Sequence, residues 1–154
     1  MASEPIILLV EDNPDDAELT RLALDEAHVT NTLVIVRDGQ EALDWLFCAG
    51  THAGRDPCQV PSLVLLDLKL PKIGGLEVLQ RLREDERTRR LPVVILTSSR
   101  EEQDVMRGYN LGANSYIQKP VDYAQFLEAI RQLGVYWMVL NEPPPPSARK
   151  ESGA

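Results

Sequence analysis

Groups that can hold a metal ion and a phosphoryl group follow four short apolar runs of this chain. The positions, each at or close to the end of such a run, are Glu11 with Asp12, Asp67, Thr97 and Lys119. If the runs are neighbouring parallel strands, their carboxyl ends meet at one edge of the sheet, which is where open α/β sheets bind ligands. Carboxylates are ligands for hard cations, and an ammonium and a hydroxyl suit phosphoryl oxygens. The spacing therefore predicts a site for a divalent cation and a phosphoryl group at that edge.

Each residue type in this set has a task in phosphoryl transfer. Crowded carboxylates repel one another, so a divalent cation is needed to hold Glu11, Asp12 and Asp67 together in ionised form. A carboxylate beside Mg²⁺ can attack a phosphoryl group and form an acyl phosphate. The cation, Lys119 and the Thr97 hydroxyl can then each take one phosphoryl oxygen, which neutralises the charge of the transition state.

Each position taken alone also has an ordinary structural interpretation. The acids around Asp12 are common in helix caps, and Thr97 with the serines after it could cap the next helix. Asp67 and Lys119 could be plain loop residues. Because the four positions occur in order, each at a strand end, the combined pattern favours a site.

Apolar runs alternate with segments of helical periodicity, which predicts βα units and an α/β fold with a parallel sheet. The expected strands cover residues 6–10, 33–36, 63–66, 93–96 and 115–118. The expected helices cover residues 14–28, 42–47, 76–82 and 101–111, and a last helix begins near residue 122. The strand runs are continuously apolar, as in strands that helices cover on both faces.

Two connections differ from ordinary loops. Residues 48–62 are longer than the usual connection of about 2–6 residues, so we interpret them as a specific insertion. Residues 83–90 are densely charged, and we expect them to be solvated.

Composition narrows the class of protein. The chain has 154 residues and a formal net charge of -8, so we expect protein partners rather than nucleic acid or anionic membranes. No apolar stretch reaches the roughly 18 residues of a membrane span, and the N-terminus does not resemble a signal peptide. We therefore expect a cytoplasmic protein with one domain at residues 1–141 and a proline-rich, disordered tail at residues 142–154.

The last helix carries a second signal. Its apolar residues that lie off the main stripe are Val135, Tyr136, Met138 and Val139. A helix on a protein surface is not usually apolar most of the way round. This pattern predicts a homodimer with these four residues in its interface, and a two-fold is the commonest arrangement. The alternative is that Trp137 and its neighbours pack on their own domain.

Several short motifs between residues 5 and 140 together carry a family resemblance. They are Glu11-Asp12, Asp67 within Leu-Leu-Asp-Leu-Lys-Leu-Pro, Gly74-Gly75, Thr97-Ser98, and residues 112–120. In this combination the chain resembles the receiver domain of two-component response regulators. The resemblance implies a doubly wound, flavodoxin-like fold: a five-stranded parallel sheet of order 2-1-3-4-5 with five helices.

The resemblance also implies a role for each acidic residue. Asp67 would accept the phosphoryl group, and it would bind Mg²⁺ together with Glu11, Asp12 and the backbone carbonyl of Lys69. Two departures from the family pattern stand here. Glu11 replaces the more usual Asp, and the Lys69 ammonium could pair with a phosphoryl oxygen or compete with the metal.

For the remaining motifs the resemblance implies a switch. Thr97 would be the switch hydroxyl, Tyr116 the aromatic residue that turns inward, and Lys119 the amine that binds phosphate. Phosphorylation would then remodel the surface formed by the fourth helix, the fifth strand and the last helix.

The insertion at residues 50–55 and the long last helix resemble stand-alone regulators that pair with bacterial phytochromes. We therefore expect a single-domain response regulator that takes a phosphoryl group from a sensor histidine kinase, with a bacteriophytochrome as that kinase. It would be no enzyme beyond catalysing its own phosphorylation and dephosphorylation. One alternative is a receiver-like scaffold that acts without phosphorylation. Another is an aspartyl-phosphate phosphatase, which would need a second acid where Lys69 stands.

Overall fold

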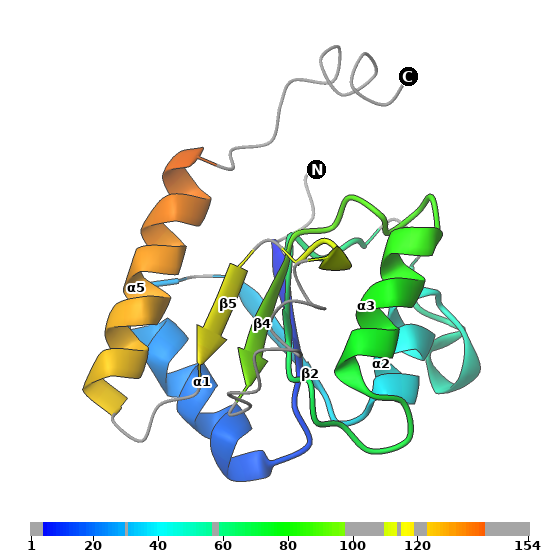
Figure 1. Ribbon diagram of the computed structural model, residues 1–154, viewed down its shortest axis with the longest axis horizontal. Coiled ribbons are helices and arrows are strands. Elements are labelled where there is room, and N and C mark those ends of the chain that lie inside the picture. The colour runs from blue at the N-terminus through cyan, green and yellow to red at the C-terminus, as the bar shows by residue number, and fades with distance from the viewer. Residues whose placement is uncertain are drawn as a thin grey trace.

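The computed structural model describes residues 5–29, 31–56, 59–97, 110–113, 115–118 and 123–140. The strands are β1 (Ile6–Val10), β2 (Thr32–Val36), β3 (Leu63–Leu66), β4 (Val93–Thr97) and β5 (Ser115–Gln118). They form one parallel sheet of order β2-β1-β3-β4-β5 (Figure 1). The helices are α1 (Pro14–Glu26), α2 (Gly39–Leu46), α3 (Gly75–Glu84) and α5 (Tyr123–Leu140), with a short 3₁₀ helix η1 (Gly50–His52). The expected fold and strand order are confirmed.

Three expected features fall outside this description. Most of the helix predicted over residues 101–111 lies outside the described residues, and so does the whole tail predicted at residues 142–154. The four residues predicted at a dimer interface belong to α5, but their side chains are outside the described part. Among the helices that are described, none is both long and apolar enough to cross a membrane.

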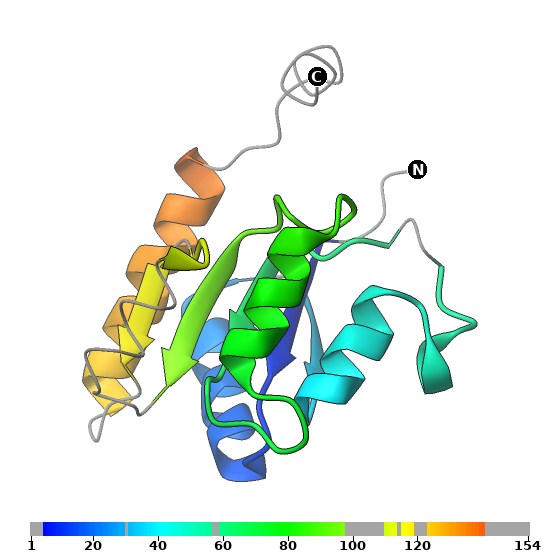
Figure 2. The same cartoon turned by 45° about the vertical axis from the view of Figure 1, so that its right-hand side comes forward.

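Helices cover both faces of the sheet (Figures 1 and 2). The α2 and α3 helices pack on one face with Leu8 and Val10, and α1 and α5 pack on the other with Ile7 and Leu9. This division follows from the strand period of two, which sends alternate side chains to opposite faces. Every residue of β1 and of β3 is buried, as the apolar runs predicted. The prediction was wrong at the edge strand β2, where Ile35 is 39% exposed, because an edge strand has only one neighbour to enclose it.

The insertion after α2 is a folded part of the domain. The Arg55 guanidinium lies 3.7 Å from the centre of the Trp45 ring. It also donates hydrogen bonds to the backbone carbonyls of Trp45 (2.7 Å) and Gln59 (2.5 Å). Such a cation–π contact contributes about 0.5–2 kcal/mol. One arginine therefore ties the middle of the insertion, and the chain at Gln59, to α2.

The connection after α3 is less solvated than its charge suggested. Thr88 is buried, and Arg83 is partly buried at the end of α3. The Arg83 guanidinium donates to the carbonyls of Gly112 (2.7 and 3.2 Å), Arg89 (3.0 Å) and Leu91 (2.7 Å). Burial lowers the pKa of Arg83 from its usual value. Most of the segment is exposed, as expected, but Arg83 is partly buried because these backbone carbonyls provide the partners that an arginine needs when it leaves water.

Candidate functional site

Three carboxylates gather at the carboxyl edge of the sheet. Glu11 and Asp12 follow β1, and Asp67 follows β3, which is the next strand in the sheet. One oxygen from each side chain lies within 4.8 Å of the other two. Glu11 is 2% exposed and Asp67 is 6% exposed, whereas Asp12 is exposed. The cluster therefore has a buried floor and an edge that opens to solvent.

Backbone hydrogen bonds at the strand ends bring these acids together. The amide of Glu11 donates to Val36 O (3.0 Å), and the amide of Asp67 donates to Val10 O (3.1 Å). The parallel register pairs Val10 with Val36 on one side and with Leu66 on the other. The residues that follow these partners consequently leave the sheet at the same level. Strand register, rather than local sequence, thus creates the cluster.

The start of α1 lies beside the same acids. The Asn13 side chain accepts hydrogen bonds from the amides of Asp15 (2.9 Å) and Asp16 (3.2 Å), which caps the helix. Pro14 takes the first helical position, where an N–H would be unsatisfied. The Asn13 amide also donates to Glu11 Oε2 at 3.4 Å. The sequence predicted the helix start but not this contact, which places the positive end of α1 next to the cluster.

The loop after β3 orients the Asp67 carboxylate. The amide of Lys69 donates to Asp67 Oδ1 at 3.2 Å, and the Lys69 side chain is exposed. The amide of Gly75 donates to Leu68 O at 3.0 Å, which closes the base of the loop. A Cβ at Gly75 would lie 2.1 Å from the backbone oxygen of Asp67, so only glycine fits there. The start of α3 is therefore pressed directly against the strand end that carries Asp67.

The other predicted site residues are placed less fully. Thr97 is the last residue of β4 and pairs with Gln118, so its backbone lies at the same carboxyl edge. Tyr116 lies in β5 and pairs with Ile95. The side chains of Thr97 and Tyr116 are outside the described part, and so is the whole of Lys119. Their roles stay predictions.

The acidic cluster has the chemistry of a site for a hard divalent cation. It offers oxygen ligands from two neighbouring strand ends, which is the donor type that Mg²⁺ and Mn²⁺ prefer. The exposed acid, Asp12, leaves the edge of the cluster open to solvent. An ion that retains water ligands fits such a half-open arrangement.

Comparisons with known proteins agree with this arrangement. The sequence profile of the response regulator receiver domain matches residues 7–131. The probable methanogenesis regulatory protein FilR2 of Methanothrix harundinacea (strain 6Ac) is 40% identical over 147 residues, which span 95% of this chain and 92% of FilR2. Response regulator Rcp1 of Synechocystis sp. is 35% identical over 133 residues, which span 86% of this chain and 88% of Rcp1.

Solved structures give the same result. The bacteriophytochrome response regulator AtBRR is 53% identical, with a TM-score of 0.74 over 92% of this chain and 100% of that one. The phosphorylated cyanobacterial phytochrome response regulator RcpA is 36% identical, with a TM-score of 0.83 over 93% and 100%. The Mn(2+)-bound form of Rcp1 is 33% identical, with a TM-score of 0.82 over 92% and 99%. With its acidic cluster at the edge of a doubly wound sheet, this chain belongs to the response regulator receiver domain family of two-component signalling proteins.

Proposed function

We propose that this protein accepts a phosphoryl group from a sensor histidine kinase onto Asp67 in a Mg²⁺-dependent reaction. The observation that carries the proposal is the cluster of Glu11, Asp12 and Asp67, whose oxygens lie within 4.8 Å of one another. A carboxylate nucleophile beside a cation site is the arrangement that phosphoryl transfer requires.

In this proposal Glu11, Asp12, Asp67 and the backbone carbonyl of Lys69 are the metal ligands, and all four donate oxygen. Two of the three carboxylates are buried, so water screens their mutual repulsion poorly. A divalent cation offsets that repulsion. The Mn(2+)-bound form of the relative Rcp1 supports a divalent ion at this kind of site.

Asp67 is the proposed nucleophile. One of its carboxylate oxygens forms a bond to phosphorus while the bond between phosphorus and the kinase histidine nitrogen breaks, and the imidazole leaves with the electron pair. The Lys69 amide holds the carboxylate in one orientation, which lowers the entropic cost of reaching the attack geometry. Mg²⁺, when bound, supplies positive charge for the phosphoryl oxygens. Lys119 and the Thr97 hydroxyl are proposed to take the others, and attack by water later releases inorganic phosphate.

The proposed output is a change of surface. A phosphoryl group on Asp67 carries about -1.5 to -2 charges in place of the carboxylate's single charge, and its new acceptor oxygens draw the Thr97 hydroxyl inward. Tyr116 follows, and the surface formed by the expected helix over residues 101–111, β5 and α5 is remodelled. The protein is proposed to act in the cytoplasm as a homodimer through Val135, Tyr136, Met138 and Val139 of α5.

The proposed kinase is a bacteriophytochrome. Two of the similar structures, AtBRR and RcpA, are response regulators of phytochromes and cover nearly the whole chain. The insertion at residues 50–55, held to α2 by Arg55, and the long last helix are the two sequence features that resemble this subgroup. The proposed activity is limited to the protein's own phosphorylation and dephosphorylation.

Phosphoryl transfer can be tested directly. Radiolabelled, autophosphorylated histidine kinases, including a bacteriophytochrome, are mixed with the protein with and without Mg²⁺. Wild type and an Asp16→Asn control, which changes an acid of α1 outside the cluster, are expected to take up acid-labile phosphate only with Mg²⁺. Asp67→Asn is expected to take up none.

Each contrary result points to a specific alternative. Label on Asp67→Asn would contradict the assignment of the phosphoacceptor. Absence of transfer from every kinase would favour a scaffold that works without phosphorylation. Turnover of a small phosphate ester would favour an aspartyl-phosphate phosphatase.

A further inference from the structure

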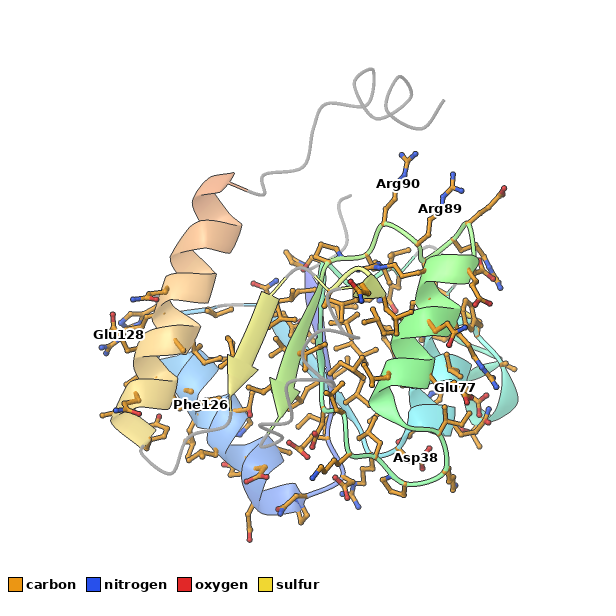
Figure 3. The ribbon with its side chains drawn as sticks, in the orientation of Figure 1. Asp38, Glu77, Arg89, Arg90, Phe126 and Glu128 are labelled. Atoms are coloured by element: carbon orange, nitrogen blue, oxygen red, sulfur yellow. The ribbon has the colours of Figure 1, made fainter. Side chains whose placement is uncertain are left out.

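The loop that follows Asp67 packs against a second loop from a different part of the chain. We call residues 68–73 the metal loop, because the proposed function assigns the Lys69 carbonyl to the cation. We call residues 37–39 the β2–α2 turn. In Figure 1 the chain entering α3 runs along the lower edge of the molecule beside the start of α2, and Figure 3 shows Asp38 at this place. In the connection that follows α3, Arg89 and Arg90 extend from the opposite edge of the molecule (Figure 3).

The two loops meet backbone to backbone at Gly39. The Gly39 amide donates to Pro71 O at 3.5 Å. A Cβ built on Gly39 would lie 2.0 Å from the backbone oxygen of Ile73 and 2.8 Å from its carbonyl carbon. Gly39 has no positive φ, so lack of space rather than backbone conformation requires glycine here. Because the obstructing atom belongs to the backbone, a side chain at position 39 can be accommodated only if the metal loop moves.

The tip of the metal loop has a backbone conformation that needs support. The Ile73 amide donates to Pro71 O at 2.9 Å across a three-residue turn, and Lys72 at its centre has a φ of 67°. Residues other than glycine seldom adopt this conformation. It persists only where the surrounding structure holds it. Here Lys72 Nζ lies 3.4 Å from Asp38 Oδ2, while Asp38 Oδ1 caps α2 by accepting from the Glu41 amide at 2.7 Å.

From these contacts we propose that Gly39 and Asp38 are positioning residues for the metal site. They hold the metal loop in the conformation that lets the Lys69 carbonyl serve the same cation as the Asp67 carboxylate. This inference rests on the proposed function, since it assumes that the cluster binds a divalent cation.

The two residues contribute unequally. Lys72 is 67% exposed on its side chain, so solvent weakens its ion pair with Asp38, which contributes less than the contact at Gly39. The close approach at Gly39 cannot be screened, because it is a steric contact. The base of the loop is fixed separately by the hydrogen bond from Gly75 to Leu68. A change at Gly39 therefore displaces the tip while the base stays in place.

The test compares two alanine substitutions next to the same loop. Gly39→Ala places a methyl group against Ile73, whereas Gly74→Ala meets no atom closer than Leu68 O at 3.9 Å. Since Gly74 is the N-cap of α3, alanine there also lowers stability, so this control separates stability from metal binding. By isothermal titration calorimetry, Gly39→Ala is expected to weaken Mg²⁺ binding about tenfold, as loss of a residue that supports metal ligands typically does. Gly74→Ala is expected to keep the wild-type dissociation constant.

A second readout does not depend on the metal. Amide hydrogen exchange in metal-free buffer is expected to be faster at Lys69 and Ile73 in Gly39→Ala than in wild type or Gly74→Ala. A folded Gly39→Ala protein with wild-type Mg²⁺ affinity overturns the inference whatever its exchange, and so does weakened affinity with wild-type exchange, because the loop would not have moved.

The remaining outcomes of the test also have defined meanings. If Gly39→Ala does not fold, Asp38→Asn takes its place, because asparagine still caps α2 but loses its charge toward Lys72. A dissociation constant raised about two- to fivefold supports the inference, given the strength of exposed ion pairs, and an unchanged one overturns it.

If wild type itself binds neither Mg²⁺ nor Mn²⁺, the proposed function fails and this inference fails with it. If wild type binds and Gly39→Ala binds equally well, only the inference fails.

Discussion

Neutralising Asp67 should stabilise the metal-free protein. One oxygen of each of Glu11, Asp12 and Asp67 lies within 4.8 Å of the others. At such a separation two unit charges repel by about 1 kcal/mol with the dielectric constant of water and by about 3.5 kcal/mol with an effective value near 20. Asp67 takes part in two such pairs, and Glu11 and Asp67 are buried, but Asp12 is exposed, so solvent screens its share of the repulsion. We expect Asp67→Asn to raise the free energy of unfolding by about 1–3 kcal/mol in metal-free buffer.

Mg²⁺ should narrow the difference in stability between the two proteins, and reverse their order if that difference is below about 1.4 kcal/mol. A ligand at ten times its dissociation constant stabilises the folded state by about 1.4 kcal/mol if it binds only that state. Wild type should gain this increment, and Asp67→Asn should gain little because it lacks one proposed ligand. Urea unfolding with EDTA and with Mg²⁺ measures both effects.

A matched control removes one acid elsewhere. Asp25→Asn changes an exposed carboxylate near the end of α1 and lowers the net negative charge by the same amount. It should show neither the stabilisation in EDTA nor the altered response to Mg²⁺. The reasoning is refuted if Asp67→Asn is no more stable than wild type without metal, or if Mg²⁺ stabilises both proteins equally.

Three other substitutions test separate parts of the argument. Lys69→Met should strengthen Mg²⁺ binding by up to about fivefold at low ionic strength, because it removes a positive charge near the proposed cation. A single and a double positive charge about 8 Å apart in water repel by about 1 kcal/mol. Calorimetry should show a smaller gain in affinity at 0.15 M salt, which screens this repulsion. Arg83→Met should lower the free energy of unfolding in urea by about 2 kcal/mol, because the backbone carbonyls that Arg83 contacts, among them that of Gly112, lose a charged donor. The control Arg81→Met removes a surface ion pair and should lower the free energy of unfolding by less than about 0.5 kcal/mol. Burial raises the pKa of the Tyr123 phenol, so the folded state holds this proton more tightly than the unfolded state. Its stabilising effect is complete below the unfolded pKa near 10 and is lost as the pH rises through the folded pKa. Wild type should therefore lose more stability than Tyr123→Phe when urea unfolding at pH 8 is repeated above pH 10, and equal losses would contradict this.

The strands were predictable because their signal is local. Runs of four or five apolar residues predict β1 and β3, and the shorter pair Tyr116-Ile117 predicts β5, all with the bounds that the structure has. The structure extends β2 and β4 by one residue each, to Thr32 and to Thr97. Both additions are threonines, whose polar hydroxyl had interrupted the apolar pattern although their branched side chains suit a strand. The acidic cluster followed from the same signal, because residues after adjacent parallel strands emerge at one edge.

The contacts that hold the loops were not predictable. Arg55 and Arg83 look like any other arginine in the sequence, yet each is partly buried and donates to backbone carbonyls. For Arg83 one of these carbonyls belongs to Gly112, 29 residues further along the chain. A sequence pattern reports the period of a helix or a strand, but it carries no record of which distant carbonyl a long side chain will reach. The same limit applies to Gly39, because no local pattern reports its close approach to the backbone of Ile73.

The proposed metal site therefore depends on two sets of contacts, one between neighbouring strands and one between two loops. The acids meet because strand register brings Glu11 and Asp67 to one level, through hydrogen bonds to Val36 and Val10. The metal loop that completes the site takes its shape from the β2–α2 turn, which lies beyond the edge of the cluster. Collecting like charges costs free energy, so the fold must supply rigid backbone at each of these points for the site to exist before a cation arrives. This requirement explains why glycines with no room for a side chain occur at both Gly39 and Gly75. Gly39 lies against the tip of the metal loop and Gly75 against Asp67 itself, so a side chain at either position would displace the backbone that supports the proposed ligands.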